Sequence, residues 1–151
     1  PSEKGTGEKS CARIFSKLLI PTDFSKPAGN AVALAQELPA VGEVMLFHVV
    51  DKGESEKEIQ EHVLAAKEKL KKLEKEFVRA GFKATSRVHV GYPPDEIISA
   101  AGNDDVSVIV LSPYGEGWVR DLKAFFVGST TSAVARRANR PVLIVKERKA
   151  A

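Results

Sequence analysis

Short apolar runs alternate along this chain with segments of helical periodicity, and this alternation leaves few possible folds. The apolar runs cover residues 16–20, 44–50, 83–90, 106–111 and 141–145. The helical segments between them cover residues 28–38, 54–80, 95–101 and 129–139. A strict alternation of strand and helix predicts an α/β domain, in which parallel strands are joined by right-handed crossovers.

The composition of the runs indicates where each strand lies in the sheet. The run 44–50 is apolar on both faces, which is typical of a strand covered by helices on each side. The run 83–90 alternates between polar and apolar residues and is predicted to be an edge strand. Ser25 and Pro27 mark the start of the first helix, and Gly81 marks the end of the second. We therefore expect an open sheet of five parallel strands with helices on both faces.

A length of 151 residues favours one domain, and we expect it to cover residues 13–148. Residues 1–12 are rich in Gly, Ser, Lys and Glu and are predicted to be a disordered tail or linker. The net charge of +3 is too small to favour a nucleic-acid or membrane partner. No apolar run approaches the roughly 18 residues of a membrane span. The single cysteine, Cys11, permits no internal disulfide, so we expect a cytoplasmic protein.

The residues after the first apolar run are candidates for ligand binding. Pro21, Thr22, Asp23, Phe24 and Ser25 follow that run directly. In open α/β sheets, ligands bind beyond the carboxyl ends of the strands, where the strand order reverses. A carboxylate at Asp23 could accept hydrogen bonds from a ribose hydroxyl or an adenine amine. The same polar side chains could instead cap the next helix, and position alone does not separate the two interpretations.

The last third of the chain contains a second candidate site. The run 106–111 leads into a glycine-containing loop at 112–117, and Gly128, Ser129, Thr130 and Thr131 begin the last helix. Backbone amides and hydroxyls at a helix start can bind an anion such as a phosphate. The alternative is an ordinary helix cap after a glycine turn. A set of basic residues could screen phosphates or form a solvated face: Arg120, Lys123, Arg136, Arg137 and Arg140.

Several kinds of site are excluded by missing motifs. The chain contains no P-loop motif and no Gly-x-Ser-x-Gly elbow of the α/β-hydrolases. A phosphoacceptor receiver domain is disfavoured because Asp23 has no acidic neighbour. His48, His62 and His89 have no Cys or carboxylate neighbours at the spacing of metal ligands. No metal site and no catalytic residue is therefore predicted.

Four motifs in order along residues 16–146 together make the chain resemble the universal stress protein family, and in particular its nucleotide-binding branch. They are KLLIPTDFS at 17–25, LFHVV at 46–50, VGYPPDEI at 90–97, and VGSTTSAV at 127–134 followed by PVLIV at 141–145. The resemblance implies a flavodoxin-like sheet of order 3-2-1-4-5, also described as adenine nucleotide alpha hydrolase-like. It also implies a homodimer formed through the last strand.

The resemblance further implies a regulatory module that binds ATP or AMP, with Mg²⁺ as a possible companion of ATP. The residues implied to contact adenine and ribose are Pro21, Thr22, Asp23, Phe24 and Val49. Those implied at the phosphate end are Leu111, Ser112, Gly115, Gly128, Ser129, Thr130 and Thr131.

The glycine loop departs from the pattern of that branch, which resembles Gly-x₂-Gly-x₉-Gly-Ser/Thr. Ser112 stands at the first glycine, and twelve residues separate Gly115 from Gly128. A Cβ at Ser112 and the missing N–H of Pro113 both alter the backbone that faces a ligand. One interpretation is an insertion that still binds phosphate. The other is a branch without nucleotide that acts as a protein interaction module. A slow ATPase is a third, weaker hypothesis, because no general base is evident.

Overall fold

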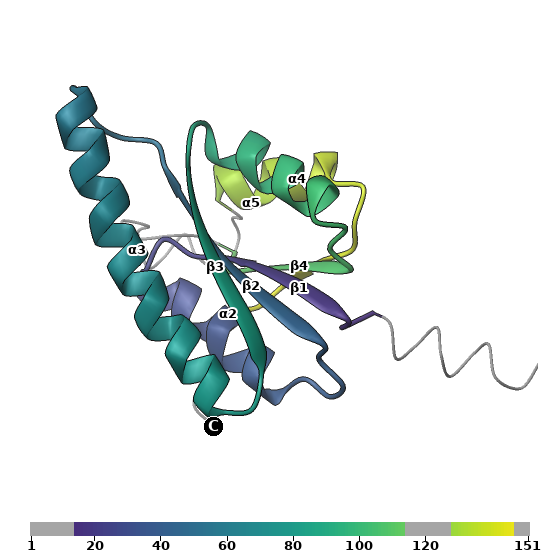
Figure 1. Cartoon of the computed structure of the whole chain (residues 1–151). Coiled ribbons are helices and arrows are strands. Elements are labelled where there is room, and N and C mark those ends of the chain that lie inside the picture. Colours follow the sequence, from purple (N-terminus) through teal and green to yellow (C-terminus); the bar gives the residue numbers. More distant parts are fainter. Residues whose placement is uncertain (1–13, 114–127, 147–151) are drawn as a thin grey trace, which may run out of the picture.

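The computed structural model describes residues 14–113 and 128–146, and Figure 1 shows their arrangement. The predicted tail at 1–12 and the predicted site residue Gly115 lie outside the described residues. The elements in chain order are β1 (Lys17–Pro21), α2 (Lys26–Glu37), β2 (Glu43–Val50), α3 (Glu56–Arg79), β3 (Lys83–Val90), α4 (Pro93–Asn103), β4 (Val108–Leu111), α5 (Ser129–Arg137) and β5 (Val142–Ile144).

The five strands form one parallel sheet of order β3-β2-β1-β4-β5, which confirms the expected strand order. β1 lies in the middle, between β2 and β4. Helices α2 and α3 cover one face of the sheet, and α4 and α5 cover the other (Figure 1). Among the described helices, none combines the length and the apolar character needed to cross a bilayer.

Side chains of β1 alternate between two separate cores, as the pleat of a strand requires. Leu18 and Ile20 are fully buried against α2 and α3. Leu19 points to the opposite face, where it packs with residues of α4 and α5. Both faces of the strand are therefore inaccessible to solvent, which explains why the run 16–20 is continuously apolar rather than alternating.

Local capping moves some element boundaries away from the predicted ones. Helix α3 begins two residues later than predicted, because the Ser55 hydroxyl caps it by accepting from the amide of Glu58 at 3.2 Å. The Glu58 carboxylate in turn accepts from the amide of Glu54, one residue before the cap, at 2.9 Å. Helix α4 begins earlier than predicted, at Pro93, since proline suits the first turn. Gly81 ends α3 with φ +95°, as predicted.

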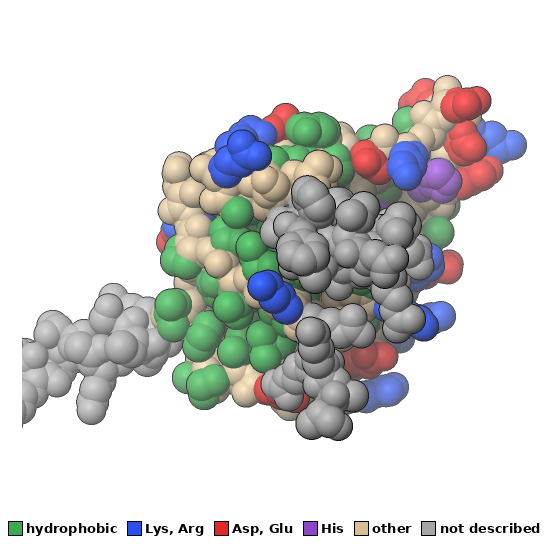
Figure 2. All heavy atoms as spheres, turned by 180° about the vertical axis from the view of Figure 1, so that it is seen from behind, with side chains coloured by type: hydrophobic (Ala, Val, Ile, Leu, Met, Phe, Trp, Pro, Cys, Tyr) green, Lys and Arg blue, Asp and Glu red, His purple; other side chains and the backbone are tan. Residues whose placement is uncertain are grey.

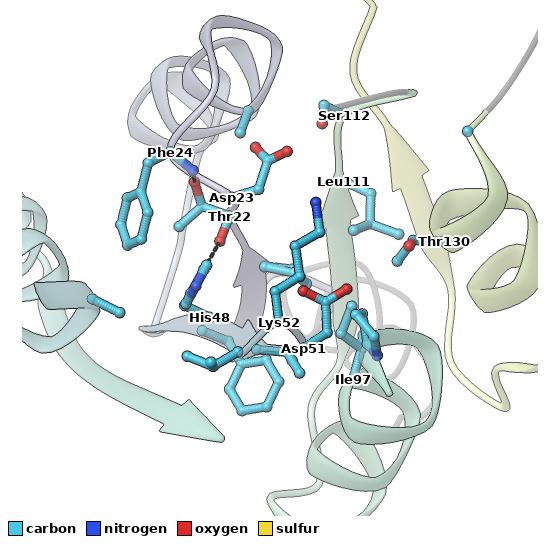
Figure 3. Close-up of a pocket in the computed structure, with 18 of the residues that line it drawn as sticks. Thr22, Asp23, Phe24, His48, Asp51, Lys52, Ile97, Leu111, Ser112 and Thr130 are labelled. Carbon is cyan, nitrogen blue, oxygen red and sulfur yellow. Dashed lines mark hydrogen bonds between the residues drawn. The ribbon is translucent and has the colours of Figure 1, made fainter. Parts of the chain in front are cut away.

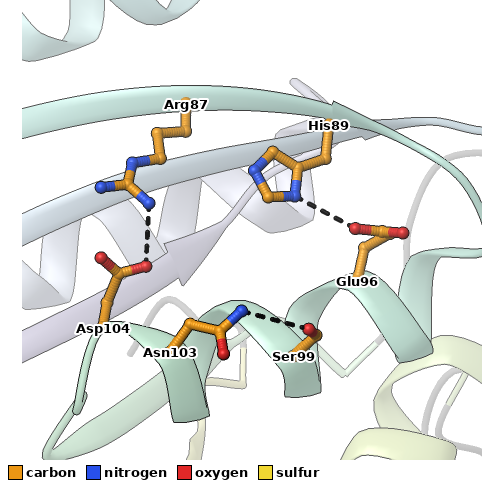
Figure 4. Close-up of polar contacts among 6 residues, drawn as sticks. All are labelled: Arg87, His89, Glu96, Ser99, Asn103 and Asp104. Atoms are coloured by element: carbon orange, nitrogen blue, oxygen red, sulfur yellow. Dashed lines mark hydrogen bonds and ion pairs between the residues drawn. The ribbon is translucent and has the colours of Figure 1, made fainter.

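Polar contacts hold the edge strand β3 to helix α4 (Figure 4). Arg87 donates to the Asp104 carboxylate at 3.0 Å, and His89 Nδ1 lies 3.1 Å from Glu96 Oε2. The turn between the two elements is tight, because a Cβ at Gly91 would lie 2.7 Å from Glu96 Oε1. Exposed ion pairs contribute little stability, so we interpret these contacts, one near each end of α4, as fixing how the helix lies along β3.

We predict that Leu70→Ala in α3 lowers the free energy of unfolding by about 2–5 kcal/mol, because it leaves a cavity in the core beneath α3. Leu70 is 1% exposed. The matched control is Leu64→Ala on the same helix, where the side chain is 62% exposed and the change should be within about 0.5 kcal/mol. Urea denaturation measures both, and equal effects would contradict the assigned face of α3.

Candidate functional site

A pocket of about 660 Å³ opens at the carboxyl end of the sheet. It lies at the ends of β1, β2 and β4, and residues of α2, α3, α4 and α5 also contribute to its wall. The strand order reverses at this place, because the chain leaves β1 toward β2 on one side and reaches β4 on the other. This is the point at which open α/β sheets bind ligands.

All of the predicted site residues line this pocket except Gly115, which is outside the described residues. They are Pro21, Thr22, Asp23, Phe24, Val49, Leu111, Ser112, Gly128, Ser129, Thr130 and Thr131. Figure 3 shows Asp23 facing the pocket from β1, with Leu111 and Thr130 opposite it. Residues Pro21 to Phe24 thus share one cavity with Leu111, Ser112 and the residues Gly128 to Thr131, which lie nearly ninety residues or more further along the chain.

The turn between β1 and α2 is held by its own polar side chains. Thr22 Oγ1 accepts from the amide of Phe24 at 3.0 Å, and Asp23 Oδ1 accepts from the amide of Ser25 at 3.0 Å. The Ser25 hydroxyl caps α2 by accepting from the amide of Ala28 at 3.3 Å. The capping interpretation of this segment is therefore correct. Asp23 nevertheless remains exposed and lines the pocket, so capping leaves its carboxylate accessible to a ligand.

Phe24 forms the wall between β2 and α3 in a backbone conformation that is unusual for its residue type. Its φ is 64°, in the left-handed region, where a side chain is strained. Its ring lies 4.8 Å from the ring of His48, and Lys69 Nζ lies 5.1 Å from the ring centre on α3. His48 Nδ1 is 2.7 Å from the carbonyl of Thr22, and because a carbonyl only accepts, that nitrogen carries the hydrogen.

At the other end of the pocket, two of the predicted phosphate donors are already engaged. The amide of Gly128 donates to the Pro113 carbonyl at 2.6 Å, and the Thr131 hydroxyl donates to the Ser112 carbonyl at 2.8 Å. The expectation that these two groups point at a phosphate is therefore not met in this structure. Ser129 and Thr130 begin α5, where no side chain caps the helix and the first amides have no intrahelical acceptor. The backbone amides of Ser129 and Thr130 are therefore the groups available to bind an anion.

Comparison with known proteins identifies the family of the chain. The model of the universal stress protein family matches residues 15–146. The chain belongs to the universal stress protein family. Universal stress protein MJ0577 of Methanocaldococcus jannaschii is 29% identical over 89% of this chain and 97% of its own length. The solved structure of MJ0577 aligns with a TM-score of 0.79 and 31% identity, covering 91% of this chain and 99% of that one.

Two further solved structures share the fold. Hypothetical protein PH0823 aligns with a TM-score of 0.74 and 35% identity over 91% of this chain and 99% of that one. A universal stress protein from Archaeoglobus fulgidus, solved in complex with dAMP, aligns with a TM-score of 0.64 and 25% identity over 88% and 99%. These alignments agree with the flavodoxin-like order of strands in the sheet.

Several residues of this universal stress protein pocket were not predicted. Asp51 and Lys52 follow β2, so the rule that identified Asp23 after β1 could have found them. His62 and Lys69 come from α3, and their direction depends on how that helix rotates on the sheet. His48 also lines the pocket, although its spacing from other residues gives no sign of a ligand. The described residues contain no group of three or more His, Cys, Asp or Glu side chains suited to a metal.

The basic residues of the last third of the chain do not reach the pocket where the structure describes them. Arg137 donates to Asp95 at 2.7 Å, and Arg140 donates to Asp105 at 2.8 Å. Arg136 donates to the Ser132 hydroxyl at 3.1 Å, one turn away. These three arginines form a solvated face, and the other two basic residues of the predicted set fall outside the described ranges.

We predict that Phe24→Gly is more stable than Phe24→Ala by about 0.5–1 kcal/mol, since glycine relieves the left-handed strain at φ 64°. The order should reverse at Lys72, an exposed residue in the middle of α3. There the alanine variant should have a free energy of unfolding about 1 kcal/mol higher than that of the glycine variant. Thermal unfolding of the four variants tests the sign. An alanine preference at both positions would show that residue 24 is not strained in solution.

Proposed function

We propose that this protein binds an adenine nucleotide, ATP or AMP, and acts as a regulatory module rather than an enzyme. The observation that carries the proposal is the pocket in which Asp23 faces the uncapped start of α5 across the ends of β1 and β4. The dAMP complex of the Archaeoglobus fulgidus relative supports it. A cytoplasmic location is part of the same proposal.

Each part of a nucleotide has a chemically suited partner in this pocket. Val49 and Ile97 offer apolar surface for the adenine ring. Asp23 offers a carboxylate for the ribose hydroxyls, and its position is fixed by its bond to the amide of Ser25. The amides of Ser129 and Thr130, at the positive end of the α5 dipole, suit the phosphates. A volume of about 660 Å³ lies in the range of small-molecule sites.

The proposed mechanism is recognition that shifts a conformational or assembly equilibrium. A ligand shifts such an equilibrium only by its difference in affinity for the two states. The pocket joins β1, β4 and α5, and β5 follows α5 directly in the chain. Nucleotide occupancy can therefore be communicated to the edge of the sheet by the last helix and strand.

We predict that the protein, stripped of co-purified nucleotide, binds ATP saturably in a calorimetric titration, and that Asp23→Asn weakens binding at least about tenfold. Loss of a hydrogen bond to a charged group has this size. Asparagine keeps an oxygen that can accept from Ser25, so the turn should be preserved. The titration is repeated with AMP and with and without Mg²⁺.

The control is Asp105→Asn, which removes an equal charge from an exposed residue that pairs with Arg140 away from the pocket. Its ATP affinity should match that of the unaltered protein. Absence of both heat and thermal stabilisation at millimolar ATP would overturn the proposal, because a ligand of the native state must raise its stability. The protein would then be assigned to the interaction modules that bind no nucleotide.

We also propose a homodimer formed through β5. Ile109 donates its amide to the Pro141 carbonyl at 2.9 Å, and Val145 donates to the Leu111 carbonyl at 2.8 Å. In a parallel pair alternate residues bond the neighbouring strand, so the amide of Ile144 faces outward. Strand β5 lies at one edge of the sheet and its residues are only partly buried. Figure 2 shows hydrophobic side chains gathered on the face of the molecule opposite to the view of Figure 1.

We predict that sedimentation equilibrium gives the mass of two chains, and that Ile144→Pro gives the mass of one. Proline removes the outward donor and is tolerated on an edge strand when its nitrogen faces solvent. Ile144→Val keeps the donor and should remain dimeric. A single-chain mass for the unaltered protein at high concentration would contradict the β5 dimer.

A further inference from the structure

Lys52 is a cationic side chain that extends into the pocket from the end of β2. Figure 3 shows its amine in the space between Asp23 on one side and Leu111 and Thr130 on the other. Lys52 lines the pocket, and none of the ion pairs among the described residues involves it. An ammonium group with this placement is available to an anionic ligand.

The backbone at Lys52 is held in place by contacts with α3. His62 Nδ1 lies 2.9 Å from the carbonyl of Lys52, and since a carbonyl only accepts, His62 is the donor. The next residue, Gly53, packs so closely that a Cβ there would lie 2.5 Å from Ile59 Cγ1. The connection between β2 and α3 therefore fixes the backbone position from which the Lys52 side chain extends into the pocket.

The balance of charge in the pocket favours a role for Lys52 with phosphate. Asp23 and Asp51 both contribute carboxylates to the lining, and these would repel the phosphates of a nucleotide. The start of α5 offers roughly half a positive charge. Lys69 lies over the ring of Phe24, at the wall. Among the described residues, Lys52 is thus the lysine that projects between the carboxylate and the helix start.

We propose that Lys52 binds the phosphate chain of the nucleotide and makes the affinity of this pocket depend on the phosphates. This inference rests on the proposed adenine-nucleotide function and adds to it a residue that determines specificity. The flexible stem of lysine lets one ammonium group follow a chain of phosphates, as a point charge and not as a fixed fork. The affinity for adenosine, which lacks phosphate, should not depend on Lys52.

The test compares the unaltered protein with Lys52→Gln by calorimetry, using ATP and adenosine as ligands. We expect ATP affinity to fall about tenfold, as for one lost charge-assisted hydrogen bond, while adenosine affinity stays within about twofold. Lys52→Arg should recover most of the ATP affinity. The difference between the unaltered protein and Lys52→Gln should shrink at high salt, because the amine is exposed.

Lys57→Gln is the matched control, since Lys57 is an exposed lysine at the start of α3 that does not line the pocket. Its ATP affinity should be unchanged. An unchanged ATP affinity in Lys52→Gln would overturn the inference, as would equal losses for ATP and adenosine, which would indicate only a change in pocket shape.

Failure of the proposed function would look different, because the unaltered protein would then bind neither adenosine nor ATP. In that case inorganic tripolyphosphate is titrated into the same proteins. Binding that is lost in Lys52→Gln and kept in Lys57→Gln would support an anion site at Lys52 without a nucleotide. Absence of tripolyphosphate binding would overturn the inference together with the proposed function.

Discussion

Burial of β1 on both faces is the constraint on which the rest of this structure depends. Leu18 and Ile20 pack under α2 and α3, and Leu19 packs under α4 and α5, so the strand can lie only in the middle of the sheet. With β1 in the middle, the chain must pass to β2 on one side and return to β4 on the other. The crossovers then lie on opposite faces, and a crevice remains at the carboxyl ends of β1 and β4. The position of the candidate site therefore follows from the packing of β1 in the core.

The turn after β1 shows how one segment can serve both folding and binding. Asp23 stabilises the turn through the amide of Ser25 and still presents its carboxylate to the pocket. Phe24 adopts a strained backbone conformation, and its ring is flanked by His48 and Lys69. Strain of this kind persists where the surrounding structure fixes it, and it is concentrated at functional sites. The alternatives left open by the sequence, cap or ligand contact, are compatible with each other here.

The sequence was sufficient to predict the strands, the helices and the two segments after β1 and before α5 that line the pocket, because periodicity and position beside a strand or helix are local signals. Val49 in the pocket lining came from the family resemblance. The order of the strands came from family resemblance. The orientation of Lys69 was not predictable, since it depends on how α3 rotates against the sheet. Nor was the bond from Gly128 to the Pro113 carbonyl, which requires two segments distant in sequence to meet. Periodicity also gives no signal for the cap at Ser55, so the predicted start of α3 lies two residues before the observed one.

The two bonds between the end of β4 and the start of α5 have a consequence for how this family can vary. Gly128 donates to the Pro113 carbonyl and Thr131 donates to the Ser112 carbonyl, so the end of β4 and the start of α5 lie side by side. The two ends of the connecting span are therefore held close together, and the entropic cost of holding the ends of a span together grows only with the logarithm of its length. Evolution can therefore lengthen or shorten this span in small steps while the two bonds keep the sheet and last helix in register.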